Sequence, residues 1–274
     1  MRHLSVSVRE CDDQLILAPT GTMTNYEAVT SFDVEGGKIT AVLHETDLSL
    51  SAALIAPQSD TITLHYKIAE ADKDFNYPLA AFVPRITRFT LAADELAKSS
   101  REIARNAGGG AAGIAAIVRA TEARFKYDHP ETRFNDGMEA VPLLSCGLTP
   151  GSCVDINTYL VASLRSAGYE AAYFYGYFFP EARGGFTDDG HCWVVTHHDG
   201  EFLEWDIAHH MKAGLGSTQP GLNPRPGKRV AVTHSMGQHY RGIGMNCEIK
   251  VLGEPMRFKG PNKLSYVSLA AHLI

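Results

Sequence analysis

The sequence predicts an α+β protein in which a small antiparallel β domain precedes a core of helices and strands. Residues 1 to about 85 alternate apolar and polar side chains, as half-buried strands do. Two helical patterns follow between about 91 and 126, and a third begins at Cys153. Two β-like runs then flank Asp199-Gly200. We therefore expect an N-terminal β domain at residues 1–88 and a core at residues 89–274.

Composition and charge exclude several classes of protein. Of the 274 residues, 45% are hydrophobic and 20% are charged, so a sizeable core is expected. The net charge of −6, without a basic run, argues against a general nucleic-acid binder. No segment approaches about 18 apolar residues, so we expect no membrane span. Residues 1–8 alternate like a strand and lack the apolar region of a signal peptide, which favours a cytoplasmic location.

The cysteines and histidines favour reduced thiols over a metal site. The five cysteines, at positions 11, 146, 153, 192 and 247, are odd in number and form no CxxC pair. His197-His198 and His209-His210 suggest a metal site, but they occur without an HExxH motif or a cysteine pair at zinc spacing. We expect neither a metal nor a cofactor.

Three features predict how the first half of the chain folds. Gly36-Gly37 separates Phe32 and Val34 from Ile39, which predicts a hairpin. Helices are expected at about 91–106 and 111–126, separated by Gly108-Gly109-Gly110. That glycine run has no Lys-Ser/Thr pair after it and no strand before it, so it is not a phosphate loop.

The stretch around Cys153 predicts a nucleophile at the start of a helix. Pro150-Gly151 breaks the chain, Ser152 is a good N-cap, and helical spacing continues to Ala167 before Gly168. A thiol at this position feels the positive end of the helix dipole, which favours the thiolate. The alternative is a buried, inert cysteine. Cys146 is the rival nucleophile, but Gly147-Leu148-Thr149-Pro150 after it is a poor helix start.

The register of the later hairpin predicts a partner for this thiol. A two-residue turn at Asp199-Gly200 places His191 and Asp206 on one face as diagonal neighbours, about 7–8 Å apart at the backbone. An imidazole backed by a carboxylate is the orienting half of a nucleophilic triad. The alternatives are a surface histidine and an aspartate that caps a turn. Cys192 falls on the opposite face and is expected in the core.

The order Cys, His, Asp resembles the transglutaminase-like superfamily of papain-like thiol enzymes, in particular its bacterial cysteine proteases. The resemblance covers about residues 110–210. Its motifs are Gly151-Ser152-Cys153-Val154-Asp155, Gly176-Tyr177, His191-Cys192-Trp193 and Asp206. Two stretches depart from the family pattern. Gly237-Gln238-His239-Tyr240 stands where members often carry Gly-Arg-Asp-Tyr, and Asp206-Ile207-Ala208 stands where they often carry Asp-Pro-Thr.

This resemblance implies a papain-like core, with the cysteine helix packed on an antiparallel sheet, and acyl-transfer chemistry. Cys153 would attack an amide carbonyl and form a thioester, His191 would move the proton, and Asp206 would orient the imidazole. The backbone N–H of Cys153 would be one oxyanion donor. No acidic cluster resembles a calcium loop.

The substrate and the fate of the thioester stay open. Hydrolysis would make the chain a peptidase or amidase acting on a protein or peptide, whereas transfer to a primary amine would make it a transglutaminase. A binding module with an idle triad is a third alternative. Arylamine acetyltransferases also use Cys, His and Asp, but their cysteine lies nearer the N-terminus. Tyr175, Tyr177 and Trp193 are candidate substrate-binding residues, although alternating tyrosines are commonly ordinary sheet packing.

Overall fold

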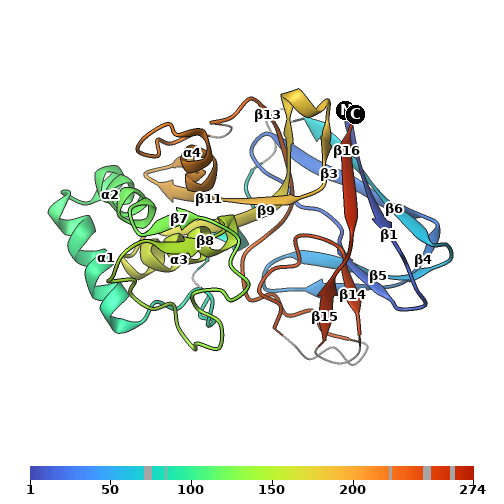
Figure 1. Ribbon diagram of the computed structural model, residues 1–274, viewed down its shortest axis with the longest axis horizontal. Helices are drawn as coiled ribbons and strands as arrows, with labels where there is room; N and C mark the ends of the chain where they lie inside the picture. The colour runs from blue at the N-terminus through green and yellow to red at the C-terminus, as the bar shows by residue number, and fades with distance from the viewer. Residues whose placement is uncertain (71–75, 84, 222–223, 243–247, 260–262) are drawn as a thin grey trace. The chain divides into compact units, whose positions relative to one another are not determined.

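The computed structural model confirms the α+β class and describes all residues except 71–75, 84, 222–223, 243–247 and 260–262 (Figure 1). The chain divides into two compact units. Unit 1 comprises residues 1–81, 175–191 and 226–274, and unit 2 comprises residues 82–174 and 192–225. Each unit therefore draws on discontinuous segments. The predicted domains at 1–88 and 89–274 are continuous stretches of chain and stay a prediction.

Unit 1 is built largely from two five-stranded sheets (Figure 1). The first has the order β10-β16-β1-β6-β3, with bounds β10 Phe186–Thr187, β16 Leu269–Leu273, β1 Arg2–Arg9, β6 Thr61–Glu70 and β3 Glu27–Glu35. The second has the order β15-β14-β2-β5-β4, with bounds β15 Leu264–Tyr266, β14 Met256–Phe258, β2 Ile16–Pro19, β5 Leu50–Pro57 and β4 Gly37–Glu45. Strand β13 (Gly227–His234) and the 3-10 turns Leu79–Ala81 and Glu181–Arg183 also belong to this unit.

The hairpin predicted at Gly36-Gly37 is wrong. Strands β3 and β4 flank Gly36, but β3 pairs with β6 in one sheet and β4 pairs with β5 in the other. Gly36 has a φ of 75°, and a Cβ there would lie 2.5 Å from the carbonyl oxygen of Thr61. The glycine therefore lets the chain turn from one sheet to the other, rather than back along the same sheet.

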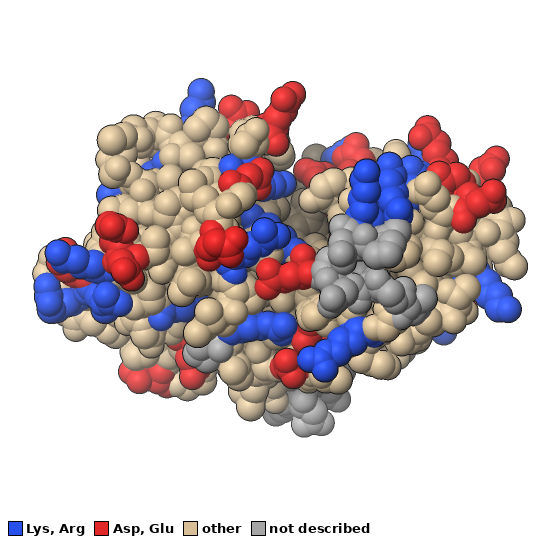
Figure 2. Space-filling view, turned by 90° about the horizontal axis from the view of Figure 1, so that it is seen from below, with Lys and Arg blue, Asp and Glu red and all other residues tan. Residues whose placement is uncertain are grey.

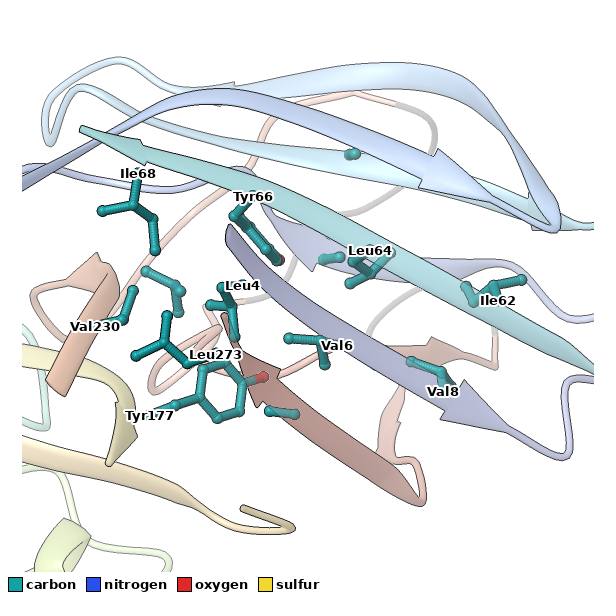
Figure 3. Packing of buried hydrophobic residues seen from close by; sticks show 14 of the residues in the cluster. Leu4, Val6, Val8, Ile62, Leu64, Tyr66, Ile68, Tyr177, Val230 and Leu273 are labelled. Atoms are coloured by element: carbon teal, nitrogen blue, oxygen red, sulfur yellow. The ribbon is translucent and has the colours of Figure 1, made fainter. Parts of the chain in front are cut away.

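The core of unit 1 follows from the predicted alternation. Alternate residues of β1 are fully buried and face alternate residues of β6, as Val6 faces Leu64 (Figure 3). Leu273 of β16 and Tyr177 join the same cluster. Burying each such side chain stabilises the fold by about 1.5–3 kcal/mol relative to leaving it exposed.

Unit 2 holds the helices and the predicted hairpin. Its helices are α1 Asp94–Asn106, α2 Gly110–Glu122, α3 Cys153–Ser166 and α4 Ile207–Ala213. α1, α2 and α3 pack on one another (Figure 1). Its short parallel strands are β7 Phe125–Tyr127 and β8 Thr149–Gly151. A four-stranded sheet has the order β12-β11-β9-β13, with β9 Glu170–Pro180, β11 Gly190–His198 and β12 Glu201–Trp205; β9 and β11 contribute residues to both units.

The helix and strand boundaries differ from the predictions at several places. α1 begins at Asp94 rather than at about residue 91. α2 ends at Glu122 because residues 125–127 pair with β8 as a strand. The β-like run predicted to reach Ile207 ends at Trp205, and Ile207 begins α4 instead. By contrast, α3 begins at Cys153 as predicted and has Ala167 as its C-cap.

The surface carries both signs of charge. On the face shown in Figure 2, acidic and basic side chains are interspersed, and neither forms a continuous field. Among the helices of the described residues, none combines the length and the apolar character needed to cross a bilayer.

Candidate active site

The nucleophile candidate stands at the first turn of α3. β8 leads into the helix, and Gly151 lies so close to Phe125 that a Cβ would come within 2.7 Å of the ring. Ser152 follows as the N-cap with φ −80° and ψ 177°, and Cys153 is the first helical residue. The thiol therefore lies where unpaired helical N–H groups and the helix dipole favour a negative charge.

A buried carboxylate holds this helix start in place. Asp155 is fully buried and accepts hydrogen bonds from the backbone N–H and the hydroxyl of Ser152, at 2.9 and 2.8 Å. Arg133 Nη1 lies 3.0 Å from the same carboxylate oxygen and 3.0 Å from Ser152 Oγ. Residue Arg133 comes from the irregular loop before β8, so this ion pair ties the loop to the helix. The capping pattern Ser152-x-x-Asp155 was available in the sequence, whereas the arginine partner was not.

Cys153 is 7% exposed, and the fully buried Cys192 is its neighbour. Asn157, one helical turn after Cys153, donates through Nδ2 to the backbone oxygen of Cys192 at 3.0 Å and to its sulfur at 3.3 Å. Burial first, and then the interaction with the Cys153 thiol, raise the pKa of Cys192 well above its ordinary value. Cys192 is therefore a neutral core thiol, as predicted.

The predicted hairpin register is confirmed. Val194 pairs with Trp205, and His198 pairs with Glu201. Asp199 and Gly200 both have positive φ, 50° and 79°, which is the geometry of a type I′ turn. The strand pairing ends at Trp205, so Asp206 stands just beyond it.

Asp206 caps helix α4 and is completely buried. Its Oδ1 accepts the backbone N–H of His209 at 3.0 Å, and its Oδ2 lies 3.1 Å from Nδ1 of the same histidine. His210 Nδ1 lies 2.9 Å from the backbone oxygen of Asp206. Burial lowers the pKa of His210, and the charge of Glu122 opposes this shift. The turn-capping alternative for Asp206 is thus present, together with two histidine contacts that the sequence reasoning missed.

His191, the second residue of β11, is 4% exposed. Its ring lies 6.2 Å from that of Phe178, centroid to centroid. His191, Asp206 and His209 each present one potential ligand atom, and these atoms lie within 4.8 Å of one another. Two imidazoles and a carboxylate could hold a divalent metal ion. The ion pair between Asp206 and His209 already brings two of these three ligand atoms together without a metal ion.

Comparison with known families identifies the segment that contains the helix start and the hairpin. Residues 97–207 match the model of the transglutaminase-like superfamily. The match begins in α1 and ends just after Asp206, so it includes all three predicted catalytic positions.

Three solved structures align with much of the chain but share little of its sequence. A candidate cysteine protease from Cytophaga hutchinsonii is 11% identical with a TM-score of 0.49, and the alignment covers 100% of this chain and 96% of that one. The periplasmic domain of TgpA from Pseudomonas aeruginosa, bound to ethylmercury, is 12% identical with a TM-score of 0.39, covering 78% of this chain and 92% of that one. A candidate protease from Parabacteroides distasonis is 15% identical with a TM-score of 0.32, covering 74% and 42%. No curated protein matches the sequence.

The predicted substrate-binding residues are buried. Tyr177 is 1% exposed and belongs to the core of unit 1, as Figure 3 shows. Trp193 is 1% exposed, and Tyr175 is 9% exposed and packs against Gly190 and Gly253. A role in substrate binding stays a prediction for all three.

The other cysteines lie in different surroundings. Cys146 is exposed in the loop before α3, and Cys11 is half-buried in unit 1. Cys247 lies outside the described residues. Among these positions, Cys153 alone combines burial with the first turn of a helix in the described chain.

The tetrad that departs from the family pattern forms a buried polar cluster in unit 1. The side chain of Gln238 is fully buried and donates through Nε2 to Thr233 Oγ1 at 3.0 Å and to the backbone oxygen of His234 at 2.9 Å. Its Oε1 accepts the backbone N–H of Leu252 at 2.7 Å. The side chain of Gln238 thus links the end of β13 to residue 252, which is a structural role.

Proposed function

We propose that this protein is a thiol-dependent acyl-transfer enzyme that uses Cys153, His191 and Asp206, with hydrolysis of a peptide or side-chain amide as its main reaction. The observation that carries the proposal is the position of Cys153, the first residue of α3 within the segment that matches the transglutaminase-like model. The buried carboxylate of Asp206, close to the ligand atom of His191, supports the other two roles.

The proposed reaction begins with transfer of the thiol proton to His191. The Cys153 thiolate attacks an amide carbonyl carbon, and the resulting oxyanion accepts the backbone N–H of Cys153 at the helix start. His191 then protonates the leaving nitrogen as the C–N bond breaks, which leaves a thioester. Water, deprotonated by His191, cleaves the thioester and regenerates the thiol. Asp206 selects the imidazole tautomer and stabilises the imidazolium.

Of the two neighbouring sulfurs of Cys153 and Cys192, the surroundings favour a charged thiolate on Cys153. The helix start favours negative charge on Cys153, whereas burial disfavours it on Cys192. The Asp155 network anchors the backbone that carries Cys153. This division assigns the chemistry to Cys153 and a packing role to Cys192.

An amine acceptor in place of water would make the same site a transglutaminase. The two reactions share the thioester and differ only in what resolves it, so partition decides between them. A mixture of glutamine-containing peptides with a fluorescent alkylamine separates the products. A new carboxyl group on the acyl product, such as glutamate in place of glutamine, reports hydrolysis, and fluorescent peptide reports transfer; the ammonia or amine released when the thioester forms accompanies both reactions. We propose a protein or peptide substrate and a cytoplasmic location.

Replacement of the nucleophile tests the proposal. We expect Cys153→Ala to abolish both product classes, because no other group forms the thioester, while circular dichroism shows an intact fold. Cys146→Ala is the matched control, and we expect it to keep full activity because that cysteine is exposed in a loop. Full activity in Cys153→Ala would refute the proposal, and its loss in Cys146→Ala would move the nucleophile there.

Iodoacetamide labelling tests the thiol without a substrate. A cysteine activated by an imidazole reacts at pH 6, where an ordinary thiol is protonated and slow. We expect the Cys153 peptide to be alkylated at pH 6 and the Cys192 peptide to stay unmodified until the protein is unfolded. An unreactive Cys153 at pH 6 would indicate the idle binding module instead.

A further inference from the structure

His209 contacts both oxygens of the Asp206 carboxylate. Its backbone N–H donates to Oδ1 at 3.0 Å, and its Nδ1 lies 3.1 Å from Oδ2. Asp206 is fully buried and His209 is 3% exposed, so water competes little for either contact. The backbone hydrogen bond to Oδ1 and the ring nitrogen close to Oδ2, both from one residue, restrict the rotation of the carboxylate more than the backbone bond alone would.

We propose that His209 is a positioning residue that holds the Asp206 carboxylate in the orientation required by His191. The proposal rests on the function proposed above and adds a fourth member to the triad. In this arrangement His209 carries the proton on Nδ1 and donates it to Oδ2, and the remaining lone pairs of the carboxylate are available to His191.

The side chain does more than helix capping requires. The cap of α4 uses only the backbone N–H of His209, which almost any residue supplies at that position. The bond from Nδ1 is additional, and it is made by the side chain of a residue that is itself buried. A substitution therefore keeps the cap and removes the second bond, so the two roles can be separated.

The charged groups around the pair are mixed in sign. A ring nitrogen of His191 on β11 lies within 4.8 Å of a carboxylate oxygen of Asp206, and His210 Nδ1 on α4 lies 2.9 Å from the backbone oxygen of Asp206. Glu122 of α2 acts on His210. Among His191, Asp206 and His209, only Asp206 has a carboxylate. The orientation of this carboxylate therefore decides which of the two imidazoles it can bind.

Asparagine and glutamine distinguish positioning from packing. The amide nitrogen of Asn lies near the place of the imidazole Nδ1, whereas that of Gln lies near the place of Nε2. We therefore expect His209→Asn to retain the bond to Oδ2, and His209→Gln and His209→Ala to lose it. Lys212→Gln, an exposed position on the same helix, is the matched control.

The readout is the alkylation rate of the Cys153 peptide by iodoacetamide, measured by mass spectrometry at pH 6 and at pH 9. The ratio of the two rates reports the imidazole-assisted thiolate and is independent of overall accessibility. We expect wild type, His209→Asn and Lys212→Gln to share one ratio, and His209→Gln and His209→Ala to show a ratio about ten-fold lower. Where a substrate is found, kcat should fall in the same order with little change in KM.

The outcomes separate this inference from the proposed function. A wild-type protein without reactivity at pH 6 would remove the triad itself. A ratio that falls in Asp206→Asn but stays at the wild-type value in His209→Gln would overturn the role of His209 alone. Equal losses in the Asn and Gln variants would also overturn it, because packing rather than the Nδ1 bond would then explain the effect. Melting temperatures identify any variant that fails to fold, and the Asn and Gln pair, with similar polarity, remains comparable.

Discussion

Asp206 supports the proposed chemistry through His191. It carries a negative charge in a fully buried position, which is costly unless donors surround it. The first turn of α4 supplies these donors through His209. The carboxylate is therefore both a helix cap and a fixed counter-charge, and the two roles are compatible because they use different lone pairs.

Removing this charge should narrow the pH range of activity from the alkaline side. A thiolate–imidazolium pair is active between the loss of the thiol proton and the loss of the imidazolium proton, so kcat/KM should follow a bell. Asp206→Asn removes the counter-charge that stabilises the imidazolium. We expect the alkaline limb to move to lower pH and the maximum to fall by at least ten-fold, measured as kcat/KM between pH 5 and 10.

The position of the alkaline limb in Asp206→Asn decides whether Asp206 is the third member of the triad. A limb that does not move in Asp206→Asn would show that Asp206 is not the third member. Glu204, which is buried on β12, and Asp199 in the turn would then be the carboxylates to replace next. Lys212→Gln serves again as the control, because it changes a charge on α4 at an exposed position.

The start of α3 shows how one helix end can be stabilised by distant residues. Asp155 binds Ser152 locally and Arg133 from twenty-two residues earlier. The carboxylate is fully buried while the Arg133 side chain is 29% exposed. The ion pair therefore has one desolvated partner and one that water reaches. Breaking it should cost less free energy of unfolding than breaking a fully buried pair.

The capping carboxylate should matter more than the capping hydroxyl. Asp155→Ala removes the acceptor for Ser152 and for Arg133 together, and we expect it to lower the free energy of unfolding by about 2–3 kcal/mol. Ser152→Ala keeps its backbone N–H, and we expect a loss of only about 1 kcal/mol. Urea unfolding of both variants measures the difference. Equal losses would mean that the hydroxyl, rather than the carboxylate, organises this helix start.

Elements with local signals were predictable from the sequence. α3 has a cap residue at Ser152 and a stop at Gly168, and both are read from a few neighbouring residues. The β11–β12 hairpin has an Asp-Gly turn, which fixes its register without knowledge of the rest of the chain. These two elements carry Cys153 and lead to Asp206, so the candidate triad could be proposed before the structure.

Elements that depend on distant partners were not predictable in this way. Gly36 looks like a hairpin turn, but the partners of its flanking strands lie at residues 50–57 and 61–70. α4 has seven residues, too few for a helical period to stand out, and Ile207 follows a β-like run. The contact of His209 with Asp206 depends on that helix, so the fourth residue of the site was missed for the same reason.

Long-range pairing also determines how the ends of the chain fold. β16, near the C-terminus, pairs with β1 at the N-terminus, as Leu273 does with Leu4. Alternation predicts that each is a strand, but it contains no information about which strands are neighbours. The composition of unit 1 from three segments follows from such pairings.

A buried histidine in unit 1 links the stability of the molecule to pH. His234 is fully buried at the end of β13, and its Nδ1 lies 3.0 Å from Ser235 Oγ. Burial lowers the pKa of His234 from 6.5 to about 3. The native protein therefore keeps this ring neutral over a pH range in which the unfolded chain binds a proton.

Acid should therefore destabilise the fold through His234. Below pH 6.5 the unfolded state binds one more proton than the native state, so stability is fully present above 6.5 and is lost progressively down to about pH 3. The loss is at most about 1.4 kcal/mol per pH unit, or about 2 kcal/mol between pH 7 and 5. We expect His234→Asn, which keeps a polar atom near Ser235, to lose about 2 kcal/mol less than wild type over that interval in urea unfolding.

His44→Asn is the matched control, because His44 also binds a serine hydroxyl through Nδ1, at 3.0 Å, but is exposed. A pH dependence in His234→Asn that equals that of wild type and of His44→Asn would show that His234 is not the group that makes the fold sensitive to acid.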